Sequence, residues 1–174
     1  LVGSEMCIRD RYESVPHRPN IVGLLKGSGN GPTLMMNDHM DTYPVMEPHK
    51  WNKTNFNPFE AKREGDLLYA RGSSDTRGNL ACTILAAQVL VEQGIKFKGD
   101  LMYCFCVDEE RDGTHGSIFL TKEVGIKADY SITAEPTAFG GEVTKGEWGM
   151  NLSIANGGHC LIEIKVEGDK AHIW

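Results

Sequence analysis

The sequence has no excess of positive charge and no long hydrophobic run, and each absence excludes a class of protein. Its 174 residues include 18 Lys and Arg against 24 Asp and Glu, which gives a net charge of −6. The basic surface typical of nucleic-acid-binding proteins is missing, so we expect no nucleic-acid partner. No apolar run approaches the roughly 20 residues that cross a bilayer, so we also expect no membrane segment.

Cysteine is scarce, and its spacing follows no known scaffold. The chain has five cysteines, an odd number, and none of them form a CxxC pair. This pattern supports neither a disulfide framework nor a zinc ribbon, and we expect a reducing, cytoplasmic setting. Cys104 and Cys106 alternate with large apolar residues, so we interpret them as core side chains rather than as a redox pair.

The two ends of the chain differ from its body. Residues 1–11 resemble the translation of a sequencing adapter, and we expect this segment to be non-native. After Thr144 the sequence changes to Gly-rich, hairpin-like strands at 150–155 and 160–166, which predict a second domain that begins near Gly146. We expect the chain to be a fragment of a longer protein at both ends.

Residues 12–145 alternate between strand and helix patterns, which predicts an α/β fold. The Gly-rich stretch at 26–32 predicts a hairpin between the first two strands, and the strands at 100–107 and 130–133 are expected to be buried in a largely parallel sheet. Strands are predicted at 21–25, 33–37, 67–70, 100–107 and 130–133, and helices at 78–93 and 116–123. The apolar stripe of the longer helix is predicted to comprise Leu80, Ile84, Leu85, Ala87, Val89 and Leu90.

Polar clusters follow four of these strands, at the ends where open α/β sheets bind their ligands. One imidazole with several carboxylates suits Zn²⁺, Mn²⁺ or Co²⁺, and carboxylates can bridge two ions. The sequence therefore predicts a two-metal hydrolase site. Its residues are His39, Asp41, Asp75, Glu109, Glu110 and Glu135.

Four segments together resemble the successive motifs of the M20 metallopeptidases. They run from Gly31 to Thr42, from Tyr69 to Gly78, from Val107 to Glu110 and from Ala134 to Thr137. That family includes acetylornithine deacetylase, succinyl-diaminopimelate desuccinylase, aminoacylases and glutamate carboxypeptidases. The resemblance implies a three-layer α/β/α zinc-peptidase-like catalytic domain, whose N-terminal part would be residues 12–145. Residues 146–174 would then be the truncated start of an inserted α+β lid, or dimerisation, domain.

The resemblance also implies a set of metal ligands. His39 and Glu135 would bind the first of two divalent ions, Asp75 would bridge both ions, and Glu110 would bind the second. Zn²⁺ would be the most common occupant, with Co²⁺ or Mn²⁺ as alternatives. The remaining ligand of the second ion in this family is a His that we expect beyond Trp174, so the chain by itself should bind at most one ion tightly and be inactive.

Three further residues would carry the chemistry. By the same resemblance, Glu109 would be the general base, and Asp41 would orient the His39 ring. His172, in a segment similar to the Gly-Lys-Ala-Ala-His of the family lid, would stabilise the oxyanion. Asp75–Thr76 is expected to be a cis peptide bond.

The sequence departs from the family pattern at several positions. Asp38 stands where Gly is usual before the metal-binding His, Ala70 stands where Gly is common, and Thr76-Arg77 replaces a frequent Met-Lys. The Asp38 substitution adds a negative charge close to the first predicted ion.

The expected function of the intact protein is hydrolysis of an amide bond in an N-acyl amino acid or small peptide, by a water held between two divalent ions. The resemblance also implies a homodimer. Two alternatives stay open: a non-catalytic homologue that keeps the cleft for ligand binding or assembly, and a mononuclear aminopeptidase-like hydrolase.

Overall fold

The computed structural model describes residues 7–136. The predicted second domain at 146–174, with its strands and His172, lies outside the described residues, as do residues 137–145 at the predicted end of the first domain. None of the helices in the described part combines the length and apolar character that a bilayer crossing requires.

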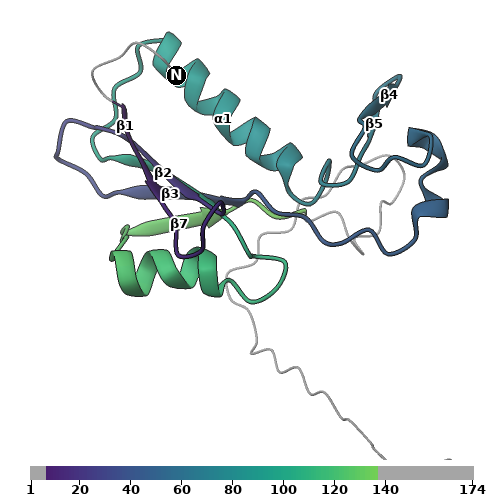
Figure 1. The fold of residues 1–174 in the computed structure, drawn as a ribbon. Coiled ribbons are helices and arrows are strands. Elements are labelled where there is room, and N and C mark those ends of the chain that lie inside the picture. The colour runs from purple at the N-terminus through teal and green to yellow at the C-terminus, as the bar shows by residue number, and fades with distance from the viewer. Residues whose placement is uncertain (1–6, 137–174) are drawn as a thin grey trace, which may run out of the picture. The chain divides into compact units, whose positions relative to one another are not determined.

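A five-stranded mixed sheet forms the centre of the fold (Figure 1). Its strand order is β1-β2-β6-β3-β7, with antiparallel β1/β2 and β2/β6 pairs and parallel β6/β3 and β3/β7 pairs. The prediction of a largely parallel sheet is therefore correct for only half of it. The strands are β1 (Cys7–Tyr12), β2 (Asn20–Leu25), β3 (Leu34–His39), β6 (Leu101–Cys106) and β7 (Tyr130–Thr133).

The predicted hairpin between β2 and β3 is wrong, because β6 lies between them. The Gly-rich connection instead crosses the start of β6, where the backbone N–H of Ser28 donates to the carbonyl of Phe97 at 2.9 Å. A side chain at Gly27 would collide with the backbone, since its Cβ would lie 2.1 Å from the carbonyl oxygen of Gly99. These glycines allow close packing of two backbones rather than a tight turn.

The last five residues of the segment expected to be non-native belong to an edge strand. β1 pairs with β2 along its whole length, from Cys7 opposite Leu25 to Tyr12 opposite Asn20. An open sheet edge offers backbone donors and acceptors to any extended segment. The adapter origin of residues 1–11 therefore stays a prediction.

Helical layers cover both faces of the sheet (Figure 1). Helix α1 (Arg77–Glu92) lies on one face, and Gly94 follows two residues after its last residue, with a φ of +65° that fits the predicted C-terminal glycine. Two short helical segments, η3 (Thr114–Ile118) and η4 (Leu120–Val124), lie on the other face, where one shorter helix was predicted.

The predicted apolar stripe of α1 is only partly correct. Thr83 and Ala87 are the buried residues of the helix, whereas the Leu85 and Val89 side chains are 58% and 54% exposed. Residues 85 and 89 lie two positions on either side of Ala87, which at 3.6 residues per turn places them on the opposite face of the helix. Ile84 is also exposed.

The core comprises one apolar cluster on each face of the central strand β6. Cys104 and Cys106 pack with Leu120 on the η4 side, whereas Leu101 and Tyr103 pack with Ala87 on the α1 side. This confirms that β6 is buried on both faces and that the two cysteines are core residues. The prediction that β7 is buried is wrong, because β7 forms an edge of the sheet and all four of its residues are exposed.

The remaining elements lie between β3 and α1 along the chain. This connection contains two single-turn helices and a small antiparallel sheet, which confirms the predicted short strand at 67–70. These elements are η1 (Pro48–Lys50), η2 (Asn52–Thr54), β4 (Lys62–Glu64) and β5 (Leu67–Tyr69).

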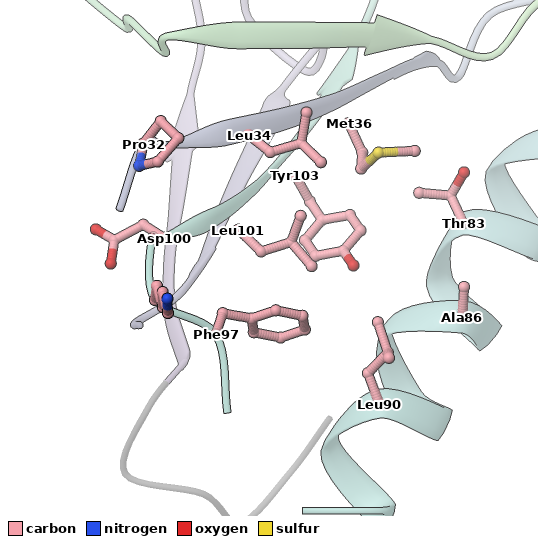
Figure 2. Close-up of a pocket in the computed structure, with 12 residues that line it drawn as sticks. Pro32, Leu34, Met36, Thr83, Ala86, Leu90, Phe97, Asp100, Leu101 and Tyr103 are labelled. Atoms are coloured by element: carbon pink, nitrogen blue, oxygen red, sulfur yellow. The ribbon is translucent and has the colours of Figure 1, made fainter. Parts of the chain in front are cut away.

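A cavity of about 340 Å³ lies between α1 and the sheet (Figure 2). Its walls are mainly apolar, and the hydroxyl groups of Thr83 and Tyr103 are among its few polar groups. None of the predicted site residues in the described part lines it.

Candidate metal centre

Six predicted site residues gather at one edge of the sheet. The parallel strands β3, β6 and β7 all end there, which is why residues far apart in the sequence become neighbours. His39 is the last residue of β3, Glu109 and Glu110 follow β6, and Glu135 follows β7. Asp41 lies just after β3, and Asp75 lies just before α1.

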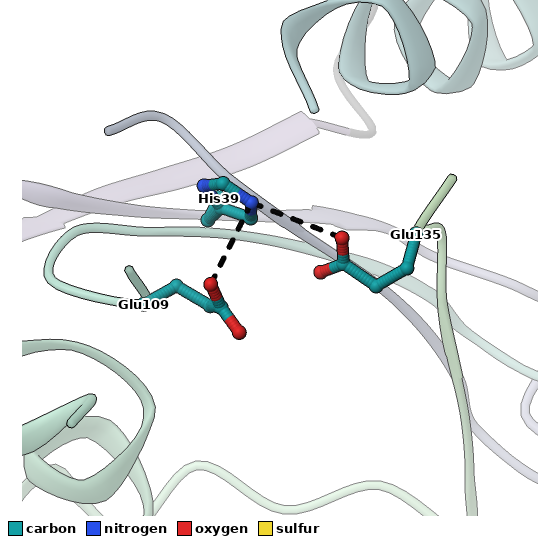
Figure 3. A group of neighbouring side chains, drawn as sticks. All are labelled: His39, Glu109 and Glu135. Carbon is teal, nitrogen blue, oxygen red and sulfur yellow. Dashed lines mark ion pairs between the residues drawn. The ribbon is translucent and has the colours of Figure 1, made fainter. Parts of the chain in front are cut away.

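The imidazole of His39 lies at the centre of this group, with its side chain only 2% exposed. Its Nε2 lies 3.1 Å from Oδ1 of Asp75, 3.7 Å from Oε2 of Glu109 and 3.9 Å from Oε2 of Glu135. Figure 3 shows the Glu109 and Glu135 carboxylates approaching the same ring nitrogen. Three carboxylates from three separate segments thus converge on one nitrogen atom.

Asp41 lies on the other side of the His39 ring. Nδ1 is 3.1 Å from the Asp41 carbonyl oxygen and 3.4 Å from its carboxylate Oδ1. The same carboxylate accepts hydrogen bonds from the backbone N–H groups of Glu109 (3.3 Å) and Glu110 (3.2 Å). Asp41 therefore contacts both the imidazole and the backbone that carries the two glutamates.

Two sets of three side chains have ligand atoms close enough to share one ion. One set is His39, Glu109 and Glu135, and the other is His39, Asp75 and Glu110, with ligand atoms within 4.8 Å of one another in each set. Glu110 also accepts a hydrogen bond from the backbone N–H of Tyr43 at 2.8 Å. Glu109, to which the family resemblance gives the role of base, thus lies at ligand distance as well.

Negative charge accumulates in this cluster, because three carboxylates lie close to one imidazole. Burial lowers the pKa of His39, but the hydrogen bond to Asp41 and the charges of Glu109 and Glu135 outweigh it and raise the pKa to about 9. Burial, together with repulsion by Glu109 and Asp75, raises the pKa of Glu135 to about 7 despite the attraction of His39. Burial also raises the pKa of Glu109.

These shifts have one common origin, which is several carboxylates held around a single imidazole. A divalent cation would neutralise the excess of negative charge. One nitrogen with several carboxylate oxygens is also a ligand set that Zn²⁺, Co²⁺ and Mn²⁺ accept. The residues present therefore fit the predicted metal.

The predicted cis peptide bond is present between Asp75 and Thr76. Thr76 is fully buried, and its hydroxyl donates to the carbonyl of Ala134 at 2.7 Å. The side-chain amide of Asn79 donates to the same carbonyl at 3.1 Å and to the Thr76 hydroxyl at 2.9 Å. The hydrogen bond between Thr76 and Ala134 was not predicted from the sequence. The one sign of it there is that Thr76 departs from the family pattern.

Asp38 is the second unexpected feature. Its side chain is only 1% exposed, and neither carboxylate oxygen has a hydrogen-bond partner among the described residues. Burial raises the pKa of this carboxyl group, although the nearby Thr83 hydroxyl and the charge of His39 act in the opposite direction. The residue preceding His39 is therefore a buried acid without a hydrogen bond, where the family resemblance leads us to expect Gly.

Comparison with known proteins identifies the family. The profile of the peptidase family M20/M25/M40 matches residues 35–170, and the chain belongs to this family. It is 34% identical over 128 residues to an N-formyl-4-amino-5-aminomethyl-2-methylpyrimidine deformylase of Bacillus subtilis, covering 72% of this chain and 29% of the relative. It is 27% identical over 147 residues to a succinyl-diaminopimelate desuccinylase of Rickettsia akari, covering 83% of this chain and 36% of the relative.

Solved structures show the same fold over part of their length. The chain matches human carnosine dipeptidase 1 with a TM-score of 0.62 and 18% identity, covering 74% of this chain and 29% of the dipeptidase. It matches a Staphylococcus aureus tripeptidase with a TM-score of 0.57 and 22% identity, covering 76% of this chain and 34% of the tripeptidase. The chain thus spans about a third of the length of its relatives.

Proposed function

We propose that the whole protein is a metal-dependent hydrolase that cleaves an amide bond in an N-acyl amino acid or small peptide. The observation that carries this proposal is the convergence of the Asp75, Glu109 and Glu135 carboxylates on Nε2 of the buried His39. Membership of the family and the names of the relatives, a deformylase, a desuccinylase and a dipeptidase, support amide hydrolysis.

His39, Asp75, Glu110 and Glu135 would hold two divalent ions, with Zn²⁺ as the first choice and Co²⁺ or Mn²⁺ as alternatives. Ions bound there would polarise the carbonyl of the substrate and lower the pKa of a water molecule. The hydrogen bond between Asp41 and Nδ1 keeps the ring turned so that Nε2 faces the carboxylates.

Glu109 is the residue suited to proton transfer. Its side chain is 50% exposed, whereas His39 behind it is buried, so a substrate can reach its carboxylate. Burial and the neighbouring carboxylates raise its pKa, which strengthens it as a base. We propose that Glu109 accepts a proton from water and passes it to the leaving amine.

Three parts of the proposal concern the whole protein. His172, outside the described residues, is proposed to stabilise the developing oxyanion. The protein is proposed to act as a homodimer in the cytoplasm. The thiols of Cys82, Cys104 and Cys106 are free, which is compatible with a reducing setting.

The test uses the complete protein with a panel of N-acetyl and N-succinyl amino acids, an N-formylated amine and dipeptides. We expect turnover of at least one class, and a loss of about 10²–10⁴-fold in kcat for Glu109→Gln. Glu92→Gln, at the end of α1, is the matched control and should retain activity. A complete protein that binds metal but turns over none of the panel would favour the non-catalytic alternative.

A further inference from the structure

We propose that Arg18, Asn20 and Asp108 are positioning residues that hold the backbone of Glu109 and Glu110 in place for metal binding. The inference rests on the proposed function and extends it to three side chains that contribute no atom to either ligand set. They act on the segment at 107–115, which comprises the loop between β6 and η3 and the first two residues of η3.

Asp108 immediately precedes the two glutamates and is 3% exposed. Its backbone has a φ of +68°, in the left-handed region that non-glycine residues rarely adopt. One carboxylate oxygen accepts a hydrogen bond from Nη2 of Arg18 at 3.0 Å, and the other accepts one from the backbone N–H of His115 at 3.3 Å. The Asp108 carbonyl also accepts the N–H of Gly113 at 2.8 Å. These bonds stabilise a conformation that the backbone alone disfavours.

Asn20, the first residue of β2, is fully buried and binds both ends of the same loop. Its side-chain oxygen accepts the backbone N–H of Val107 at 3.0 Å, and its side-chain nitrogen donates to the carbonyl of His115 at 2.9 Å. Arg18 and Asn20 are only two residues apart, so a single short segment supplies both contacts. The loop is thereby fixed to β2 where it begins and where it ends.

The centre of the loop is held from the opposite direction. The Asp41 carboxylate accepts the N–H groups of Glu109 and Glu110, and Asp41 itself follows β3. The two glutamates are thus fixed between β2, through Arg18 and Asn20, and the His39 segment, through Asp41. If the outer contacts are lost, the backbone that aims both glutamates at His39 becomes free to move.

Arg18 is the residue to change first, because its side chain is 41% exposed and its loss leaves the core intact. Arg18→Met keeps much of the side-chain volume but leaves the Asp108 carboxylate, 4% exposed, without its cationic partner. Lys26→Met is a matched control at the other end of β6. Lys26 pairs with Asp100 at 2.8 Å, and Asp100 also accepts a backbone N–H, from Gly27 at 2.9 Å.

The first measurement is amide hydrogen exchange of Glu109 and Glu110 in the metal-free 174-residue chain. We expect about tenfold faster exchange in Arg18→Met and unchanged exchange in Lys26→Met. The second is Zn²⁺ affinity, measured by calorimetry. Arg18→Met should lower this affinity about tenfold, as is usual when a residue that positions metal ligands is lost, and Lys26→Met should leave it unchanged. Asp108→Asn tolerates the left-handed backbone, so it should weaken binding because it removes the charge and one of the two oxygens that accept from Arg18 and His115.

The Arg18→Met, Asp108→Asn double variant should bind Zn²⁺ about as weakly as Asp108→Asn, because both substitutions break the same ion pair, that between Arg18 and Asp108. Unchanged exchange at Glu109 and Glu110 in Arg18→Met would overturn the inference, as would fully additive losses of Zn²⁺ affinity. If the unmodified chain binds no Zn²⁺, the metal centre proposed at His39 is contradicted, but the exchange measurement still decides whether these residues hold the loop.

Discussion

The hydroxyl of Thr76 donates a 2.7 Å hydrogen bond to the carbonyl of Ala134. Thr76 directly follows Asp75, and Ala134 directly precedes Glu135, so this single bond joins two segments that each supply a carboxylate to His39. Asn79 reinforces it by donating to the same carbonyl. The separation of the two carboxylates is therefore fixed by polar contacts behind them.

Replacing Thr76 with Val should lower Zn²⁺ affinity about tenfold, because Val has the same shape but cannot donate to Ala134. It should also cost about 1 kcal/mol of stability, since the partly buried Ala134 carbonyl loses one of its two donors. Calorimetry and thermal unfolding measure the two effects. Thr76→Ser keeps the hydroxyl and should retain affinity. Thr54→Val is the control, because Thr54 is also buried and donates to the Trp51 carbonyl. Equal losses of Zn²⁺ affinity in Thr76→Val and Thr54→Val would contradict the claim that the Thr76–Ala134 hydrogen bond positions the two carboxylates.

The metal-free chain should become less stable as pH rises from about 5 to 9. The pKa of Glu135 is about 7 against 4.5 ordinarily, and that of His39 is about 9 against 6.5. The folded chain thus holds protons that the unfolded chain releases, so the contribution of each group is lost as pH rises through its folded pKa. For the buried His39 the loss should be roughly 3 kcal/mol.

Urea unfolding in EDTA at several pH values measures this loss. His39→Asn should flatten the dependence between pH 6.5 and 9, and Glu135→Gln should flatten it between pH 4.5 and 7. Added Zn²⁺ should reverse the trend, because binding displaces the His39 proton and strengthens as pH rises. Stability that rises with pH across both windows in the metal-free chain would contradict the proposed charge cluster.

Asp38→Asn should stabilise the chain by about 1 kcal/mol at pH 7, because it removes a buried charge that has no hydrogen-bond partner. Burial raises the pKa of Asp38, so the cost of this charge is greatest at high pH and falls as the carboxyl group is protonated. The gain should therefore shrink towards pH 4. Thermal unfolding at pH 4, 7 and 8 tests this, and a loss of stability at pH 7 would show that the carboxylate is needed.

The two faces of α1 should respond differently to substitution. Leu85→Gln should change the free energy of unfolding by less than about 0.5 kcal/mol, because Leu85 is exposed in this chain. Ala87→Gln should cost about 3 kcal/mol or more, since Ala87 is 1% exposed and packs against the sheet. Urea unfolding separates the two, and similar costs would place Leu85 in the core.

The sequence alone predicted the elements well where their patterns are strong. The run around Cys104 predicted the central strand and its burial, and Gly94 marked the end of α1. Strand order was not predictable from local patterns, because the insertion of β6 between β2 and β3 depends on contacts about 70 residues apart along the chain, such as that between Lys26 and Asp100. The Gly-rich segment before β3 was read as a turn because close packing and tight turns both select glycine.

The site residues that lie at the ends of parallel strands were predictable from the sequence. His39 ends one parallel strand, Glu109 and Glu135 follow two others, and that rule alone brings them together. Thr76, Asn20 and Arg18 could not be found in this way. Each acts through a hydrogen bond to a residue distant in sequence, and a polar residue near a strand or helix end carries no signal of such a partner.

Zn²⁺ titration of the metal-free chain by calorimetry, alongside His39→Ala and Asp75→Asn, tests the central claim most directly. The account predicts tight binding of one ion to the unmodified chain, loss of that binding in His39→Ala, and a marked weakening in Asp75→Asn. Equal Zn²⁺ affinity in all three proteins would show that the carboxylates around His39 are not a metal centre.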